Sequence, residues 1–233
     1  MSAGTVSAQE GENASNPLAA VSNTDLRWQY LDLPDGGGRV NDYFVDGAFM
    51  ASPKLKVKYE LHYWETNVTG KARTGLESAL AKLIYFPKQG ITSGGTRYRL
   101  AVGLDYIHDF DNQDKGIGFG ADQIGPFVGT ALALDGGLTV IPLLQHFESV
   151  SGNDISITAA RVIAIQRLPK AFWLKLDLKV PYDWEAGTIP ADAEVQLGTN
   201  VREGLALYVD LKAGVGSDRL YDWGVGIGVR FNY

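Results

Sequence analysis

The sequence has no cysteine in 233 residues, and it has only two methionines and three histidines. Without cysteine the chain has no disulfide bond, no cysteine-based zinc site and no thiol nucleophile. Histidine chemistry is limited to His62, His108 and His146.

Long apolar runs are also missing. No stretch of about 18 apolar residues occurs, which excludes membrane-spanning helices. The mean hydropathy of −0.08 resembles that of a soluble protein, but strands that alternate apolar and polar residues hide an apolar face from such an average. The net charge of −6 argues against a nucleic-acid partner.

Glycine and tyrosine are abundant by contrast, with 28 and 11 residues. This combination of turn formers and strand formers predicts an all-β fold. The middle of the chain contains no linker-like segment, so we expect one domain over residues 24–233.

The segment Tyr221–Tyr233 has the clearest pattern in the chain. Its odd positions are apolar or aromatic and its even positions are small or polar, up to the last residue. A terminal strand with one unbroken apolar face is what a transmembrane β-barrel needs to close against its first strand. We therefore predict a single antiparallel up-and-down transmembrane β-barrel.

Alternating stretches bounded by turn residues give about twelve strands, each near the length that crosses a membrane at a tilt. The predicted strands are Asp25–Leu33, Asn41–Ala51, Leu55–Glu65, Gly75–Phe86, Thr96–Phe110, Gln123–Leu134, Leu138–Glu148, Ile155–Leu168, Ala171–Trp184, Ile189–Thr199, Gly204–Val215 and Tyr221–Tyr233. The predicted periplasmic turns are short and the outer loops are mostly longer, as in outer-membrane barrels. The segment Lys88–Gly95 is an exception, because it is long for a periplasmic turn.

Two of these strands are ambiguous. The segment Gly75–Phe86 also fits an amphipathic helix, but a lone helix there would interrupt the antiparallel pairing. In Ile155–Leu168, Arg161 shares a face with Ile163 and Ile165, so the direction of that face is open.

Lysine or arginine on the lipid side near mid-membrane costs about 2–4 kcal/mol, so charged faces are expected to line the lumen. The predicted lumen-lining residues are Lys56, Lys58, Glu60, His62, Arg99, Asp105, Lys175, Asp177, Lys179, Asp192, Glu194, Asp210, Lys212 and Arg230, with Arg27 and Arg97 on the same faces. These charges either line a water-filled path that selects solutes or neutralise one another and plug it.

The first 23 residues are rich in Ser, Ala, Gly and Asn and have no secretory signal. For a barrel we expect that a signal peptide preceded this numbering and was removed. We expect residues 1–23 to form a flexible periplasmic arm, with a lumen plug as the less favoured role.

Three segments resemble a known family: Asn16–Tyr30, Ile141–Glu148 and Tyr221–Tyr233. They are similar to bacterial outer-membrane proteins grouped with the MetA-pathway of phenol degradation, a set of small-molecule transporters. The resemblance covers nearly the whole barrel and implies its architecture more than its substrate. It implies no catalytic residues.

The C-terminus also resembles the signal by which the barrel-assembly machinery recognises its substrates, through Gly228, Phe231 and Tyr233. Gly226 departs from that pattern, which usually has a polar residue there. Aromatic residues also anchor barrels at the membrane interface, and both roles are compatible. The expected partners are outer-membrane lipid, lipopolysaccharide and the barrel-assembly machinery.

An enzyme is the less favoured expectation. No histidine lies in a recognisable Ser/His/Asn or Ser/His/Glu motif, so a lumen or rim hydrogen bond is the simpler role for each. Asp109, Asp111, Asp114 and Asp122 crowd the longest outer loop, but their spacing misses the EF-hand pattern, so a solvated loop is expected instead of a metal site. We expect no cofactor.

The sequence thus predicts a passive channel for small, aromatic or apolar molecules in a Gram-negative outer membrane. A closed barrel with structural or surface-interaction duties is the alternative, and a lipid-modifying hydrolase is the third.

Overall fold

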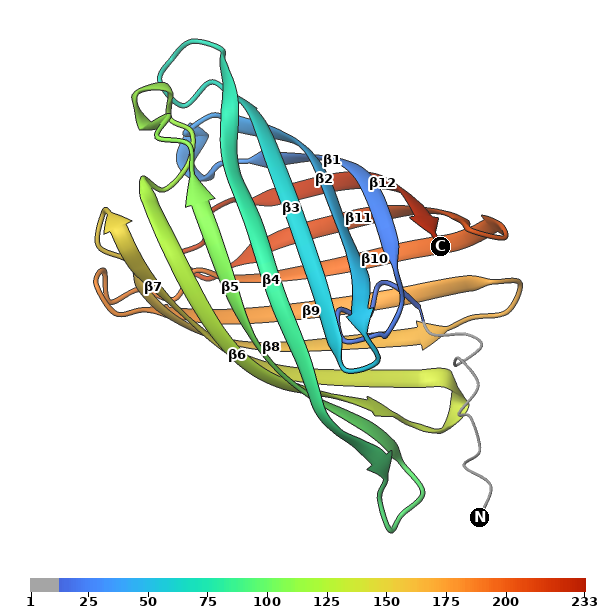
Figure 1. The fold of residues 1–233 in the computed structure, drawn as a ribbon. Helices are drawn as coiled ribbons and strands as arrows, with labels where there is room; N and C mark the ends of the chain where they lie inside the picture. The colour runs from blue at the N-terminus through green and yellow to red at the C-terminus, as the bar shows by residue number, and fades with distance from the viewer. Residues whose placement is uncertain (1–12) are drawn as a thin grey trace.

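A computed structural model describes residues 13–233. In this part of the chain, twelve strands form one closed antiparallel barrel, which confirms the predicted all-β fold class (Figure 1). The strands are β1 (Asn23–Asp32), β2 (Arg39–Ser52), β3 (Leu55–Thr66), β4 (Arg73–Ile91), β5 (Arg97–Asp109), β6 (Ala121–Ala133), β7 (Leu138–Gly152), β8 (Ser156–Arg167), β9 (Phe172–Asp183), β10 (Ala191–Arg202), β11 (Leu205–Val215) and β12 (Trp223–Asn232). Three short 3₁₀ turns lie in the connections: η1 (Pro34–Gly36), η2 (Gln113–Lys115) and η3 (Asp135–Gly137).

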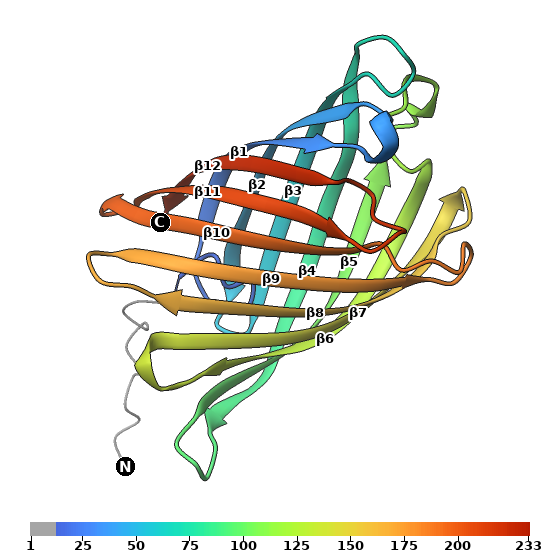
Figure 2. The same ribbon diagram turned by 180° about the vertical axis from the view of Figure 1, so that it is seen from behind.

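The barrel closes where the alternating C-terminal strand meets the first strand. β1 and β12 pair antiparallel from Asn23 opposite Asn232 to Asp32 opposite Trp223. Each strand otherwise pairs with its neighbours in sequence, so the sheet has no free edge. Figure 2 shows β8 to β12 completing the wall from the other side.

The wall is apolar outside and polar inside, as the period-two pattern predicts. On β9, Leu174, Leu176 and Leu178 are 39–42% exposed, whereas Lys175 and Asp177 between them are at most 9% exposed. The same alternation holds on β3 and β11, where Lys56 and Asp210 point inward and are 1% exposed. No helix among residues 13–233 is long and apolar enough to cross a membrane.

Both ambiguous segments are strands. β4 pairs with β3 and β5 along the segment Gly75–Phe86, so the helical alternative for that segment is wrong. The predicted turn Lys88–Gly95 is also wrong, because Lys88 to Ile91 pair with β5 and only residues 92–96 form the turn. A register shift between Tyr85 and Lys88 interrupts the alternation and conceals this continuation.

The five connections at one end of the barrel are therefore all short: residues 53–54, 92–96, 134–137, 168–171 and 203–204. We call this the short-turn end. The opposite end, with residues 110–120 as its longest connection, is the long-loop end. The chain enters β1 and leaves β12 at the short-turn end (Figure 1).

Candidate functional site

A cavity of about 320 Å³ lies inside the barrel. Its lining comes from nearly every strand and from the residues that precede β1. The lining residues are Ala14, Ser15, Pro17, Leu18, Asn23, Arg27, Gln29, Phe44, Asp46, Lys56, Lys58, Glu60, His62, Lys82, Ile84, Phe127, Leu143, Gln145, Arg161, Ile163, Lys175, Glu194, Gln196, Lys212 and Arg230. We call this space the lumen cavity.

Residues 13–22, the N-terminal segment, pack against the inner wall at the short-turn end. Leu18 and Ala19 are buried, with at most 1% exposure. The carbonyl oxygen of Leu18 accepts a hydrogen bond of 3.1 Å from Arg99, and that of Ala19 accepts one of 2.8 Å from Lys56. The N-terminal segment therefore contributes part of the lining of the lumen cavity.

Ser15 joins this segment to the opposite wall. Its hydroxyl donates to Oε1 of Gln196 on β10 at 2.7 Å and accepts from Nη1 of Arg230 on β12 at 2.8 Å. The expected boundary between arm and barrel at residues 23 and 24 falls at the start of β1. Residues 1–12 of the expected arm lie outside the described residues.

Buried ion pairs join β1 to β11 and β12. Arg230 forms a two-point pair with the fully buried Asp25, at 2.9 and 2.7 Å. The hydroxyl of Tyr208 donates to the same carboxylate at 2.7 Å. Arg27 pairs with Asp210 at 2.9 Å. Charged groups in a poorly hydrated interior need such partners, and here each has one across the barrel seam.

A second network runs along the inner face of β8 to β11. Arg161 binds Asp177 at two points, 2.8 and 2.6 Å. Lys175 lies 2.6 Å from Glu194, which also pairs with Lys212 at 3.0 Å. One carboxylate thus holds two lysines, and both lysines line the lumen cavity.

A third network lies on β2 to β5. His62 contacts Asp42 through Nδ1 at 2.9 Å and Glu60 through Nε2 at 3.4 Å. Lys82 pairs with Asp105 at 2.9 Å and its ammonium lies 5.0 Å from the ring centroid of Phe127. His62 is therefore held in a lumen hydrogen-bond network, the role that the sequence favours for it.

The predicted lumen residues separate into two groups. Eight of the fourteen line the lumen cavity: Lys56, Lys58, Glu60, His62, Lys175, Glu194, Lys212 and Arg230. The other six are Arg99, Asp105, Asp177, Lys179, Asp192 and Asp210. Of these, Asp105, Asp177 and Asp210 are buried behind the cations with which they pair. Lys179 and Asp192 lie opposite each other on β9 and β10, beyond the cavity toward the long-loop end.

The structure adds lining residues that the sequence analysis did not assign. Lys82 was obscured by the ambiguity of its strand, although it shares the alternation of Leu80 and Ile84. Arg161 points inward together with Ile163 and Ile165, which settles the direction of that face. The apolar residues Phe44, Phe127 and Leu143 lack any sequence signal for a lumen position, because apolar side chains are expected on the lipid side.

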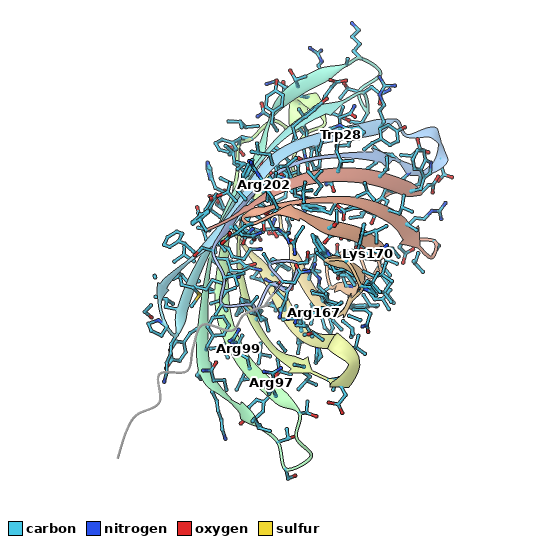
Figure 3. All side chains as sticks on the ribbon, turned by 90° about the vertical axis from the view of Figure 1, so that its right-hand side faces the viewer. Trp28, Arg97, Arg99, Arg167, Lys170 and Arg202 are labelled. Carbon is cyan, nitrogen blue, oxygen red and sulfur yellow. The ribbon has the colours of Figure 1, made fainter. Side chains whose placement is uncertain are left out.

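A larger cavity, of about 760 Å³, lies at the short-turn end between the N-terminal segment and the ends of β8 to β12. Arg167, Arg202 and Arg230 line it, with Trp173 and the C-terminal Tyr233. Figure 3 views this end, where the labelled Arg97, Arg99, Arg167, Lys170 and Arg202 give the rim a basic character.

The aspartate cluster of residues 109–122 lies at the long-loop end. Asp109 is 4% exposed and accepts hydrogen bonds from the backbone N–H groups of Asp111, Phe119 and Gly120. Asp109 thus organises the loop and departs from the expected solvated loop, whereas Asp111 and Asp114 are exposed. Among residues 13–233 no group of three His, Asp or Glu side chains is placed to hold a metal ion.

The other two histidines lie near this end. His108 contacts the carboxylate of Asp122 at 3.0 Å and is half exposed. His146 lies on the outward face of β7, where it contacts Thr158 and Glu148. Neither side chain is part of the lumen cavity.

The residues of the expected assembly signal occupy different sides of the wall. Phe231 and Tyr233 are exposed and face outward. Gly228 faces inward, and a Cβ added there would overlap the ring of Tyr208. Close packing of this aromatic ring is thus a sufficient reason for glycine at position 228, and the signal itself stays a prediction.

No family model and no curated protein sequence matches this chain. Among solved structures, the NanC porin is similar with a TM-score of 0.70 and 11% identity, over 90% of this chain and 100% of that one. An outer membrane channel from Pseudomonas putida F1 has a TM-score of 0.67 and 8% identity, over 92% and 96%. Outer membrane phospholipase A from Escherichia coli has a TM-score of 0.54 and 14% identity, over 91% and 92%. The chain has the fold of the small outer-membrane β-barrels, a fold found in both channels and an enzyme.

Proposed function

We propose that this protein is an outer-membrane channel through which small solutes pass passively. The observation that carries the proposal is the lumen cavity, a charged and hydrogen-bonding space inside a closed barrel whose outer surface is apolar. Only a closed barrel satisfies the backbone of a β-sheet in lipid, and the charged inner face then surrounds a path for polar solutes. The channel needs neither a catalytic group nor a cofactor.

The resemblance to transporters of the MetA-pathway group extends this proposal to aromatic or apolar solutes in a Gram-negative outer membrane. The apolar lining residues Phe44, Phe127 and Leu143 support that extension, because apolar side chains in a binding space favour a solute with an apolar group. Lipopolysaccharide and phospholipid are the partners of the outer wall.

A liposome-swelling assay with phenols, sugars and fatty acids tests the proposal. Proteoliposomes that contain the folded barrel should swell faster than protein-free liposomes in at least one of these solutes. Swelling that equals that of protein-free liposomes in every solute would contradict the channel and favour a closed barrel, plugged by its ion pairs and by the N-terminal segment.

One observation favours a second candidate, a hydrolase of membrane lipids. On the outer wall, Nδ1 of His146 lies 3.0 Å from Oγ1 of Thr158, and Nε2 lies 3.2 Å from Oε2 of Glu148. Trp184 donates its indole N–H to the same threonine oxygen at 2.9 Å, which leaves the hydroxyl proton free to be donated to another acceptor. A hydroxyl, an imidazole and a carboxylate in a row are the parts of a nucleophilic hydrolase.

Phospholipid turnover separates the two candidates. Hydrolysis of a fluorogenic phospholipid by the wild-type protein, lost in both His146→Ala and Thr158→Val, would establish the hydrolase. Fluorescence at the level of the buffer would exclude it. Channel activity should be the same in these two variants and in the wild type, because neither residue lines the lumen cavity.

A further inference from the structure

The charges that line the lumen cavity are predominantly positive. The lining cations are Arg27, Lys56, Lys58, Lys82, Arg161, Lys175, Lys212 and Arg230, together with His62. Among the residues that the structure describes, the lining carboxylates are Asp46, Glu60 and Glu194. Positively charged side chains therefore predominate around the cavity, although the whole chain carries a net charge of −6.

Four of the carboxylates that balance these cations lie behind them. Asp25, Asp105, Asp177 and Asp210 are each at most 5% exposed, and none of them lines the cavity. Each is paired with a lining cation, as Asp177 is with Arg161 and Asp105 with Lys82. In these four ion pairs the cation lines the open space and the anion lies toward the wall.

One side of the same cavity carries most of its apolar lining residues. Ile84, Phe127 and Ile163 belong to one buried cluster, against which Leu143 packs. These residues come from β4, β6, β7 and β8, whereas most of the lining cations come from β1, β3, β9, β11 and β12. Lys82 lies over the ring of Phe127 and joins the two sides.

Exposed charges at the long-loop end are screened more strongly than these interior charges. Loop carboxylates such as Asp111 and Asp114 are surrounded by water and salt, which screen them within about 8–10 Å. Charges in a confined lumen are screened much less, so the narrow space determines which ions pass.

We propose that the lumen cavity selects small organic anions that carry an apolar or aromatic group, with aromatic monocarboxylates as the type. The carboxylate contacts the cations, and the hydrocarbon part contacts Phe127 and Leu143. This inference rests on the proposed channel function and specifies that the aromatic or apolar solutes proposed above carry a negative charge.

Reversal potentials in planar bilayers test the proposal. Gradients of sodium benzoate, sodium gluconate and benzylammonium chloride give the permeability of an aromatic anion, a hydroxylated anion and an aromatic cation. We expect benzoate to be at least about tenfold more permeant than benzylammonium, since one charge contact at close range is sufficient for that ratio. Benzoate should also be more permeant than gluconate.

Matched variants identify the lining residues that are responsible for the preference for aromatic anions. Lys175→Gln with Lys212→Gln removes two lining charges and should reduce the ratio of benzoate to benzylammonium several-fold. Lys179→Gln is the control, because Lys179 lies on the same face of β9 but does not line the cavity. Leu143→Asn should reduce the ratio of benzoate to gluconate and leave the charge ratio unchanged.

The outcomes distinguish this inference from the channel proposal. Failure of every ion, chloride included, to cross the folded wild-type barrel overturns the channel itself. A conducting barrel that passes benzylammonium as readily as benzoate overturns the anion selection and leaves the channel standing. A conducting, anion-selective barrel that prefers gluconate to benzoate overturns the claim that the apolar lining residues favour anions with an apolar group.

Discussion

The ammonium group of Lys56 donates a hydrogen bond of 2.8 Å to the carbonyl oxygen of Ala19, which ties the N-terminal segment to the inner face of β3. Lys56 is 1% exposed, so this contact lies within the barrel. Ala14, Ser15, Pro17 and Leu18 of the same segment line the lumen cavity. The segment consequently narrows the space that a solute has to cross.

Deleting residues 13–22 should increase the unit conductance in planar bilayers, because the path then loses the side chains of this segment. Heat-dependent migration on gels checks that the variant is still a folded barrel. An unchanged unit conductance in the folded variant would show that the segment does not narrow the path.

Charge reversal of Lys175 should shift ion selectivity toward cations. Lys175→Glu places a carboxylate beside Glu194 in the lining, where its field is poorly screened. Lys179→Glu should have a smaller effect, because Lys179 lies outside the lumen cavity. The reversal potential in a potassium chloride gradient measures both, and the lipid-facing Leu176→Val and Leu178→Val should match the wild type. Equal shifts for the two lysines would contradict the assigned lining.

Gly228→Ala should destabilise the folded barrel by about 1–3 kcal/mol, the usual cost of overpacking a well-filled interior. The added methyl group overlaps the ring of Tyr208, whose hydroxyl is bound to Asp25. Gly226→Ala is the matched control, because its Cβ would come no closer than 3.2 Å to Trp28 O. The urea midpoint in detergent micelles reports both changes, and a Gly228→Ala midpoint above that of Gly226→Ala would argue against this packing.

Replacing Phe231 and Tyr233 by alanine should reduce the yield of folded protein in the outer membrane far more than Asn232→Ala. Both aromatic side chains are exposed on the lipid side at the end of the chain, whereas Asn232 alternates toward the lumen. Quantifying the heat-modifiable form in membrane fractions measures the effect. Equal yields would remove the case for a C-terminal assembly signal.

Two connections at the long-loop end are joined by a pH-dependent hydrogen bond. The pKa of Asp218 lies below its ordinary value because its carboxylate accepts a hydrogen bond of 2.9 Å from the backbone N–H of Ile189, and a second one from Ser217. A lowered pKa in the folded state means that the contact stabilises the loops above the ordinary pKa of aspartate. This stabilisation is lost as the pH falls through the lowered value.

The amide resonance of Ile189 should therefore stay constant from neutral pH down to the ordinary aspartate range and move only at lower pH. In Asp218→Ala it should no longer follow this titration. The amide of Gly214, which donates to the backbone carbonyl of Asp222, is the control. Movement of the Ile189 resonance well above the aspartate range would contradict the assignment.

The sequence was sufficient for the barrel because its wall has a strict period. Strands such as β9 and β12 alternate apolar and polar residues without interruption. The unbroken apolar face of the last strand predicted that it closes the barrel against β1. The pattern failed at Lys88, where a register shift breaks the alternation and made the end of β4 look like a turn.

The sequence predicted which side chains point into the lumen, but not where along the barrel axis each of them lies. Lys175 and Lys179 have the same place in the alternation, yet only Lys175 lines the cavity, because the position of a residue along the barrel axis depends on the register of all twelve strands. Leu18 and Ala19 lie in a segment without period, so their burial depends on tertiary contacts with Arg99 and Lys56 that no local pattern encodes.

The central claim is that this barrel crosses a membrane and conducts. Single-channel recording of the purified, heat-modifiable protein in a planar bilayer tests it most directly. We expect discrete current steps in the wild type and larger steps after deletion of residues 13–22. A folded, inserted barrel that carries no current in either form would contradict the claim and identify a closed, charge-filled barrel.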